Sequence, residues 1–356
     1  MEKRKLKNKK LINVLEKVAP GTDLRSAIEQ ILRARTGALI VMGDTPSVKR
    51  VVNGGFNLEC DFTPHRLYEL AKMDGAIILD DDAKRILSAN VHLVPDSSLA
   101  TSETGIRHRT AERVARQTKA VVISISQKRE VVSVYFEGHK HVIEDIPVVL
   151  AKANQALQTL EKYKSRLDQV TANLSALEFE DLVVLIDVIT VIQRGEMVER
   201  IAREINRYIS ELGVDGRLLR LQLDELMGGV TEDALMVLKD YAIEPRFADK
   251  TKAQLTEMSN EALLDLVSIT QMVGYDGTNI LDKSVHPRGY RMLKRIPRLP
   301  IKIVNKIVDR FGSLKAVVNA SNDLLDDVDG VGAVRARAIQ DGLKRLKEYN
   351  LLERYI

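Results

Sequence analysis

The pattern of apolar and polar residues predicts a mixed α/β domain over residues 10–140. Short apolar runs bounded by turn residues alternate here with segments in which apolar residues recur every three or four positions. These patterns predict strands at 37–43, 76–79, 86–94, 119–126 and 131–136, and helices at 24–35, 64–72 and 111–118. Because sheet domains place ligands at the loops between strands and helices, we expect a site at one of these junctions.

The region from residue 147 to 283 predicts helices alone. A stripe of apolar residues steps by three and four in a heptad pattern that lasts under three heptads. The stripe comprises Leu160, Tyr163, Leu167, Val170, Leu174 and Leu177. Such a short stripe is more typical of packing within one chain than of an oligomer interface. Residues 178–191 predict one strongly apolar helix, and Gly213, Gly228 and Gly229 mark later helix ends.

Residues 324–339 resemble a helix-hairpin-helix motif. Gly330 and Gly332 permit a tight turn whose backbone N–H groups approach a DNA phosphate at the start of the next helix. Arg335 and Arg337 would extend that contact. An ordinary turn between two helices is the alternative. A Rossmann loop is excluded, because no strand precedes the glycines and an arginine stands where the third glycine belongs.

A degenerate first copy of this motif lies upstream, in residues 296–300 followed by a helix at 301–311. Its prolines lack N–H donors, so we expect this copy to pack rather than bind DNA. Residues 286–356 carry 15 Lys and Arg against 8 Asp and Glu, in a chain whose net charge is +4. Residues 1–10 are also basic, so the middle of the chain is acidic. This distribution is typical of a nucleic-acid-binding module at the C-terminal end.

The rest of the composition bounds the class of protein. The chain has 356 residues, of which 45% are hydrophobic, and is long enough for two or three domains. A single cysteine, Cys60, allows no internal disulfide and fits a reducing compartment. No apolar segment follows the basic N-terminus as it would in a signal peptide, and no run approaches the ~18 apolar residues of a membrane span. We therefore expect a cytoplasmic protein without membrane contact.

A basic cluster directly before a predicted helix supplies the first candidate chemistry. Thr110 predicts the N-cap of this helix, and Glu112 then lies in its first turn. Arg107, His108 and Arg109 would crowd the positive end of the helix dipole, where cations are disfavoured unless an anion is bound. Two guanidiniums, an imidazole and free backbone N–H groups suit a phosphate. A solvated basic turn is the alternative.

Asp74, Gly75 and Ala76 form a second cluster, at the start of the strand at 76–79. Taken alone, Asp74 reads as a turn residue before glycine. The two clusters together resemble the paired motifs of diadenylate cyclases, and their flanks agree over 72–77, 89–95 and 103–115. That family usually has threonine where this chain has Ile106. One hydroxyl near the phosphate is therefore lost, while the backbone N–H remains.

The resemblance implies the condensation of two ATP into cyclic di-AMP with release of two pyrophosphates. Asp74 would hold a divalent metal, Mg²⁺ or Mn²⁺, and favour deprotonation of the attacking 3′-hydroxyl. Arg107 and Arg109 would neutralise triphosphate oxygens, and His108 would orient one of them. The resemblance implies further ATP contacts for Gly75, Ala76, Leu93, Ile106, Thr110 and Ser126.

Two other functions stay open. Residues 72–75 match the Lys-x-Asp-Gly motif of DNA ligases, in which the lysine becomes adenylylated and needs a depressed pKa. In this hypothesis Lys72 is the nucleophile, but the ligase pattern continues with an arginine at the position of Ile77. The third hypothesis is a non-catalytic DNA-binding scaffold, because Ile106 departs from the cyclase motif.

Three domains are expected along the chain. Residues 1–145 form a mixed sheet flanked by helices, 146–285 an all-α spine, and 286–356 an all-α DNA-binding domain. In this order the three parts resemble the family of DNA integrity scanning proteins over essentially the whole chain. The resemblance implies a homo-oligomer, an octamer with its cyclase domains facing in pairs. It also implies that branched or duplex DNA binds and lowers synthesis.

Overall fold

The computed structural model describes the backbone of residues 2–353 and the side chains of residues 10–350. The chain divides into two compact units. One contains Met1–Asn154 and Asn206–Arg220, and the other contains Gln155–Ile205 and Leu221–Ile356. The expected boundary at 145/146 falls between the last strand and the first long helix of the chain. The expected boundary at 285/286 lies inside the second unit, so the three-domain division stays a prediction.

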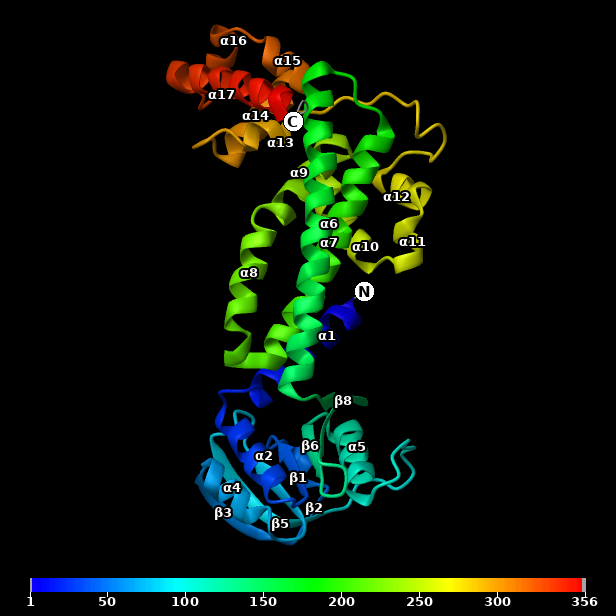
Figure 1. Cartoon of the computed structure of the whole chain (residues 1–356), viewed down its shortest axis with the longest axis vertical. Coiled ribbons are helices and arrows are strands. Elements are labelled where there is room, and N and C mark those ends of the chain that lie inside the picture. The colour runs from blue at the N-terminus through cyan, green and yellow to red at the C-terminus, as the bar shows by residue number, and fades with distance from the viewer. Residues whose placement is uncertain (1, 354–356) are drawn as a thin grey trace. The chain divides into compact units, whose positions relative to one another are not determined.

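The first unit is built on an eight-stranded mixed sheet (Figure 1). Its strand order is β2-β5-β4-β1-β6-β7-β8, and β3 pairs with β5 beside β2. Strands β1 and β4 are parallel, and the other pairs are antiparallel. The strands are β1 (Ala38–Met42), β2 (Val52–Asn53), β3 (Phe56–Asp61), β4 (Ala76–Leu79), β5 (Arg85–Leu93), β6 (Val121–Ser126), β7 (Val131–Phe136) and β8 (His139–Ile143).

Helices cover both faces of this sheet, and alternation along each strand assigns residues to one face or the other. On one face Ile40 of β1 joins a buried cluster with Ile28 of α2 and Leu67 of α4. On the other face Leu39 of β1 packs in a cluster with Val114 of α5. The helices are α1 (Glu2–Val18), α2 (Asp23–Arg33), α3 (Pro46–Lys49), α4 (Pro64–Leu70) and α5 (Ile106–Thr118). The mixed α/β class predicted for this region is confirmed.

The five predicted strands are confirmed to within two residues at each end, but β2, β3 and β8 were not predicted. Strand β3 leaves almost every side chain exposed, so it lacks the apolar alternation that marks a strand. Strand β8 contains two histidines and a lysine in five residues. Both strands form because they pair along an edge of a sheet whose core is already built.

The start of α5 was predicted wrongly. Its N-cap is Gly105 and its first residue is Ile106, so Thr110 is not the cap and lies inside the helix. Glu112 is therefore not a first-turn acid. Its carboxylate instead accepts a hydrogen bond from the Thr101 hydroxyl at 2.6 Å, and this contact holds the loop that precedes the helix.

The rest of the chain is helical, as expected. Its elements are α6 (Ile146–Glu180), α7 (Leu185–Leu212), η1 (Gly213–Gly216), α8 (Arg217–Met227), α9 (Val230–Tyr241), η2 (Pro245–Phe247), α10 (Ala248–Glu257), α11 (Asn260–Leu264), α12 (Leu266–Val273), α13 (Tyr290–Lys294), α14 (Ile301–Phe311), α15 (Leu314–Asn319), α16 (Asn322–Asp326) and α17 (Gly332–Glu353). Leu160, Leu167 and Leu174 of the heptad stripe are buried within the single chain, while Tyr163 is largely exposed. Packing within the chain therefore accounts for these three leucines.

Residues 178–191 do not form one helix. The chain turns at Asp181, which has a φ of +59°, and α7 begins only at Leu185. The turn is held from a distant segment, because the Leu185 N–H donates to the Lys283 carbonyl at 2.8 Å. The Asp181 carboxylate also accepts hydrogen bonds from His286 and Lys315. These partners lie about a hundred residues away along the chain, so local periodicity could not reveal the turn.

The C-terminal segment contains two similar helix–turn–helix units. Helices α13 and α14 form the first, and α16 and α17 form the second. Both turns contain a residue with positive φ at the corresponding position, Arg298 at +62° and Gly330 at +86°, and the second also has Gly332 at +62° where α17 begins. Each turn also buries a pair of apolar residues in one common core, comprising Ile296, Leu299, Val328 and Val331. The two segments thus turn alike at Arg298 and Gly330, but they differ two residues later, where Pro300 has a φ of −67° and Gly332 a φ of +62°.

Candidate active site

A cavity of about 860 Å³ lies in the first unit, on the sheet face that α5 covers. Its volume suits a nucleotide-sized ligand. Both sequence clusters meet here, although they come from different parts of the chain. The predicted site residues that line it are Asp74, Gly75, Ala76, Leu93, Ile106, Arg107, His108, Thr110 and Ser126. Arg109 does not line the cavity; its side chain is exposed on the next position of α5.

The turn at Asp74 and Gly75 is fixed by strand β5. Gly75 has a φ of +91°, and a Cβ there would lie 2.8 Å from the backbone carbon of Asn90. The Asn90 side chain donates from Nδ2 to the Asp74 carbonyl at 2.7 Å. The Asp74 carboxylate itself is fully exposed. The backbone is therefore anchored while the carboxylate stays free for a ligand, and Asn90 is a supporting residue that sequence reasoning missed.

Arg107 connects this turn to the start of β1. One guanidinium nitrogen, Nη2, lies 3.8 Å from the Asp74 carboxylate. The other, Nη1, lies only 2.7 Å from the point where a Cβ on Gly37 would be. Glycine at position 37 thus leaves room for the guanidinium, and any side chain there would displace it. The cavity therefore holds an acid and an arginine side by side.

The N-terminus of α5 provides a second source of positive potential. Gly105 has no side chain to cap the helix, so the amides of the first turn are available to a ligand. Ile106 begins the helix with its side chain 78% exposed at the cavity. The exposed apolar surface of Ile106 contributes no hydrophobic stabilisation, and the side chain has no hydroxyl to donate to a phosphate.

The loop before α5 is held against the helix by three side chains. Arg113 donates to the Leu99 carbonyl at 2.9 Å, and Arg116 donates to the Ala100 carbonyl at 2.7 Å. Glu112 accepts from Thr101, as described above. These contacts hold the loop so that Glu103, two residues after Thr101, lines the cavity.

His108 sits at the centre of a polar cluster that sequence reasoning missed. Its Nδ1 lies 2.9 Å from the hydroxyl of Tyr135 on β7. Glu103 forms an ion pair at 2.7 Å with Lys140 of β8. Burial, and then the positive charges of Lys140 and Arg129, lower the pKa of His108, although Glu103 opposes them. Burial and the nearby Glu103 raise the pKa of Tyr135 well above its usual value.

The turn between β6 and β7 also contributes cations. Lys128 and Arg129 line the cavity beside Ser126, although the sequence suggested only a connecting turn there. With Arg107 and Lys140 they give the cavity four cationic side chains. The acidic side chains that line it are Asp74 and Glu103, and Glu103 is already paired with Lys140. A strongly anionic ligand such as a triphosphate suits this balance.

The donor set fits a divalent cation that relies on its ligand for most of its coordination. Among the described residues no group of three or more His, Cys, Asp or Glu side chains converges to hold a metal. Asp74 offers one fully exposed carboxylate, 3.8 Å from Arg107, and Glu103 is occupied by Lys140. Magnesium-type ions commonly combine one or two carboxylates with substrate phosphates and water. Asp74 together with a triphosphate would meet that requirement.

Lys72 lacks the environment of an adenylylated lysine. It pairs with Glu69 at 2.7 Å, lies over the ring of Tyr68, and does not line the cavity. The hydrogen bond to Glu69 raises the pKa of Lys72. A lysine nucleophile needs the opposite shift, so the structure disfavours the ligase hypothesis.

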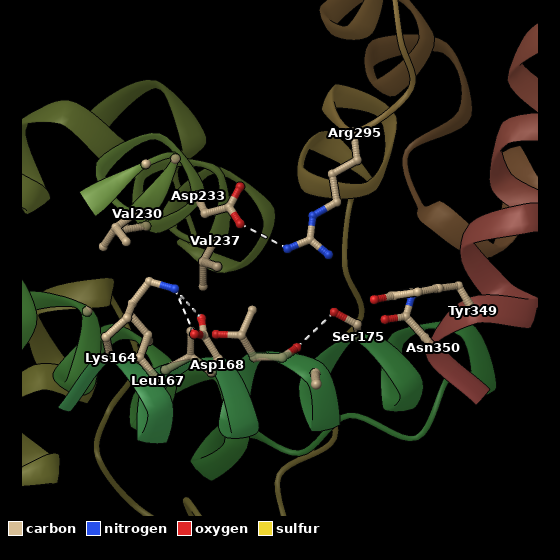
Figure 2. A pocket seen from close by; sticks show the side chains of 17 residues that line it. Lys164, Leu167, Asp168, Ser175, Val230, Asp233, Val237, Arg295, Tyr349 and Asn350 are labelled. Atoms are coloured by element: carbon tan, nitrogen blue, oxygen red, sulfur yellow. Dashed lines mark hydrogen bonds and ion pairs between the residues drawn. The ribbon is translucent and has the colours of Figure 1, made fainter. Parts of the chain in front are cut away.

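A second cavity, of about 270 Å³, lies in the helical unit (Figure 2). Its charged lining residues are already paired with each other: Lys164 lies 2.6 Å from Asp168, and Arg295 lies 2.9 Å from Asp233. Because each charge is matched by its neighbour, this cavity lacks a charged group aimed at a ligand. The cavity in the first unit remains the candidate active site.

The predicted DNA-contact residues gather at the second turn of the C-terminal segment. Gly330 and Gly332 both have positive φ. A Cβ on Gly330 would meet Ile303 Cδ1 at 2.8 Å, whereas Gly332 has open space around it. Arg335 and Arg337 are exposed on the first turns of α17.

The acids of this turn are neutralised from α14. Lys306 pairs with Asp329, and Arg310 lies 3.2 Å from Asp327. The cations of α17 are therefore not opposed by free carboxylates of the turn.

Within the described residues, no helix is long and apolar enough to span a membrane.

Comparisons with known proteins identify the region that contains most of this cavity as nucleotide-binding. The family model of the DisA bacterial checkpoint controller nucleotide-binding region matches residues 25–140, and the model of its linker region matches residues 143–281. The DNA integrity scanning protein DisA of Symbiobacterium thermophilum is 55% identical over 345 residues, covering 96% of this chain and 97% of that protein. The protein of the same name from Carboxydothermus hydrogenoformans is 51% identical over 346 residues, covering 96% and 98%.

A third relative is the DNA integrity scanning protein DisA of Clostridium botulinum strain Langeland. It is 49% identical over 348 residues, covering 98% of this chain and 99% of that protein. The fold and the nucleotide-binding region are those of a diadenylate cyclase, which is a nucleotidyltransferase. The chain belongs to the family of the DNA integrity scanning protein DisA. The resemblance seen in the sequence is thereby confirmed.

Proposed function

We propose that the chain condenses two ATP molecules into cyclic di-AMP and two pyrophosphates. The observation that carries this proposal is the meeting of Asp74, Arg107 and the N-terminus of α5 in one cavity of nucleotide size. In each of two steps, a ribose 3′-oxygen forms a bond to an α-phosphorus. The bond from that phosphorus to pyrophosphate breaks, and the 3′-hydroxyl proton is released. The protein contributes positioning and charge stabilisation.

The predicted residues that line the cavity have roles that their placement supports. Arg107, the first-turn amides of α5 and Thr110 would bind triphosphate oxygens, and Ser126 would add a hydroxyl from the end of β6. Leu93 and the backbone of Gly75 and Ala76 would contact the nucleoside. A divalent ion held by Asp74, Mg²⁺ or Mn²⁺, would lower the pKa of the 3′-hydroxyl and neutralise charge on the phosphates. Arg109 is exposed and does not line this cavity, and we assign it to the nucleotide of a facing subunit.

The direct experiment is to incubate the purified full chain with ATP and Mg²⁺ or Mn²⁺ in the absence of DNA and identify the products by mass spectrometry. We expect cyclic di-AMP and pyrophosphate in a ratio of one to two. Protein carrying covalent AMP on Lys72 would support the ligase hypothesis instead. Binding of ATP without any product would support the scaffold hypothesis.

Arg107 and Arg109 are expected to differ in their effects. Replacing Arg107 with alanine should weaken binding of an ATP analogue by roughly 1.5–3 kcal/mol, the scale of a hydrogen bond to a charged group. Arg109→Ala should leave binding to a dilute, unpaired chain nearly unchanged, and should weaken binding only in assembled protein. Calorimetric titration at low and high protein concentration measures both effects. Equal losses at every concentration would contradict the assignment of Arg109 to the facing subunit.

We further propose that the C-terminal segment binds duplex or branched DNA through its phosphates and thereby lowers synthesis. The observations that favour this are the basic balance of residues 286–356 and the open space around Gly332 at the start of α17. Exposed Arg335 and Arg337 follow on the same helix. Because such contacts are to the backbone, binding should depend strongly on salt and little on sequence.

Gly332 provides a cleaner test of DNA binding than Gly330, since a side chain at Gly330 would clash with Ile303 and disturb the core. We expect Gly332→Asn, which tolerates positive φ, to weaken DNA binding by obstructing the backbone while the protein stays folded. Synthesis without DNA should be unchanged, and inhibition by a four-way junction should be relieved. Anisotropy titrations and cyclase rates with and without the junction measure this. Undiminished DNA affinity would exclude the turn as the contact.

A further inference from the structure

We propose that Tyr135, backed by the Glu103–Lys140 pair, is a positioning residue that fixes the proton on Nδ1 of His108. His108 then donates to an ATP phosphate through Nε2 only when its ring is protonated. This inference rests on the proposed function, because it assigns His108 a substrate phosphate. It adds three residues, Glu103, Tyr135 and Lys140, to which the sequence assigned no role; they lie on the loop before α5 and on strands β7 and β8.

The geometry leaves His108 one free nitrogen. Nδ1 lies 2.9 Å from the Tyr135 hydroxyl, and the two rings meet edge to face with centroids 6.2 Å apart. Tyr135 is almost fully buried, at 1% exposure, so its hydroxyl cannot exchange partners with water. Since Nδ1 is occupied, Nε2 is the only ring nitrogen left to meet a ligand in the cavity that His108 lines.

Glu103 decides the direction of the hydrogen bonds. Burial opposes ionisation of this carboxyl, but hydrogen bonds from Lys140 and Tyr135 outweigh burial and lower its pKa. Glu103 is therefore a carboxylate that can only accept, and it accepts the hydrogen bond that the Tyr135 hydroxyl donates. Lys140, which pairs with Glu103 at 2.7 Å, lies 5.9 Å from the centroid of the Tyr135 ring. The Tyr135 oxygen must then accept from His108, which places the imidazole proton on Nδ1.

Neutral His108 in this state presents a lone pair at Nε2. A lone pair facing a phosphate oxygen is repulsive, whereas the protonated ring donates a charge-assisted hydrogen bond. In the free protein, burial and the charges of Lys140 and Arg129 lower the pKa of His108. The negative phosphates of bound ATP would raise it. Binding of ATP is therefore coupled to uptake of one proton by His108.

The sign of the pH dependence follows from this coupling. Affinity for ATP should be fully developed below the His108 pKa of the free protein. It should fall as pH rises above that value and level off above the pKa of the complex, with a slope of at most about tenfold per pH unit. The groups that set the window are Glu103, Tyr135, Lys140 and Arg129, which surround the ring from the preceding loop, β7, β8 and the β6–β7 turn.

Tyr135→Phe tests the assignment. Without the hydroxyl, neutral His108 can move its proton to Nε2 and donate to phosphate without becoming charged. We expect the slope of affinity against pH to flatten, with a moderate loss of affinity at low pH. Binding of 3′-deoxy-ATP, which cannot be condensed, is measured by calorimetry between pH 6 and pH 9 in full-length protein. The titration of the ligand itself is common to all variants and cancels in the comparison.

Three further variants complete the experiment. In Glu103→Ala the Tyr135 hydroxyl is free to donate its hydrogen bond to Nδ1 of His108, so the His108 proton can lie on Nε2. The slope of affinity against pH should flatten in the same way, and this variant provides the test if Tyr135→Phe does not fold. Tyr68→Phe removes a hydroxyl outside the cavity and should keep the wild-type slope. In His108→Gln the slope should be absent, and adding Tyr135→Phe should change it no further. A wild-type slope in both Tyr135→Phe and Glu103→Ala would overturn the proposal.

Because this readout is binding, it is independent of catalysis. Wild-type protein that binds 3′-deoxy-ATP with the expected slope but yields no cyclic di-AMP would contradict the proposed reaction and leave the His108 assignment standing. The opposite outcome is a wild-type protein that makes cyclic di-AMP and whose slope of affinity against pH is unchanged by Tyr135→Phe and Glu103→Ala. This outcome would support the proposed reaction and contradict the His108 assignment.

Discussion

Asp74→Asn should reduce the synthesis of cyclic di-AMP by roughly two to three orders of magnitude or more, the scale expected when a positioned metal and base are lost. The amide is nearly isosteric with the carboxylate but carries no charge and is a poor ligand for Mg²⁺ or Mn²⁺. Synthesis is measured by chromatography of product from ATP, at saturating metal and without DNA.

The structure indicates that this substitution leaves the fold intact. The Asp74 carboxylate is fully exposed, and Asn90 holds the backbone carbonyl of Asp74 rather than its side chain. The melting temperature should therefore match that of the wild type. Lys72→Ala is the matched control, since Lys72 lies on the same turn and outside the cavity. An active Asp74→Asn enzyme, or an inactive Lys72→Ala enzyme, would contradict the assigned roles.

Much of the sheet could be predicted from the sequence because its central strands are buried on both faces. Strand β1, Ala38–Met42, is buried at every position and is therefore a plain apolar run. Strand β3 could not be predicted, because it gains its hydrogen bonds from β5 while its side chains stay in solvent. The pairing partner, rather than the local pattern, determines that such a segment is extended.

From the residues alone, the candidate site could be predicted only where its residues are consecutive; Leu93 and Ser126 were suggested by the family resemblance. Asp74 and Gly75 form one short sequence motif, and Arg107 and His108 form another. Such motifs can be recognised without a structure. Tyr135 was not recognised, because it does not line the cavity and acts only through its contact with His108, on the face of β7 that also carries Ser133. Glu103 and Lys140 were missed for a similar reason: each looks like an ordinary surface charge until a loop and a strand edge bring them together.

The error in the start of α5 has a physical lesson for the site. A hydroxyl residue before a helical pattern predicted the N-cap at Thr110, yet the N-cap is Gly105, five residues earlier, and glycine has no side chain to cap the helix. Cations in the first turn and an uncapped N-terminus are both unfavourable in the empty protein. A bound triphosphate removes both penalties, so the local violation is itself consistent with a phosphate site.

Pairing of subunits should be obligatory for formation of the cyclic product. One chain supplies one Asp74 and one cavity, enough for one ATP, while the product joins two nucleotides through two equivalent bonds. Two cavities must therefore face each other across a two-fold axis, as they would in an octamer of facing cyclase pairs. We expect monomers to bind ATP and form no product. The rate per subunit should fall as the protein is diluted through its dissociation range, in step with the mass from light scattering.

Mixed pairs provide the sharper measurement. When wild-type and Asp74→Asn chains are mixed equally and allowed to exchange, about half of the pairs should contain one of each. In such a pair only one of the two cavities can activate its 3′-hydroxyl, so one phosphodiester bond forms and one pyrophosphate leaves. The expected product is the linear dinucleotide that still carries a 5′-triphosphate, and its appearance on mixing is followed by mass spectrometry. If mixing yields only cyclic di-AMP, at half the wild-type rate, then each chain completes both bonds alone and the facing arrangement is wrong.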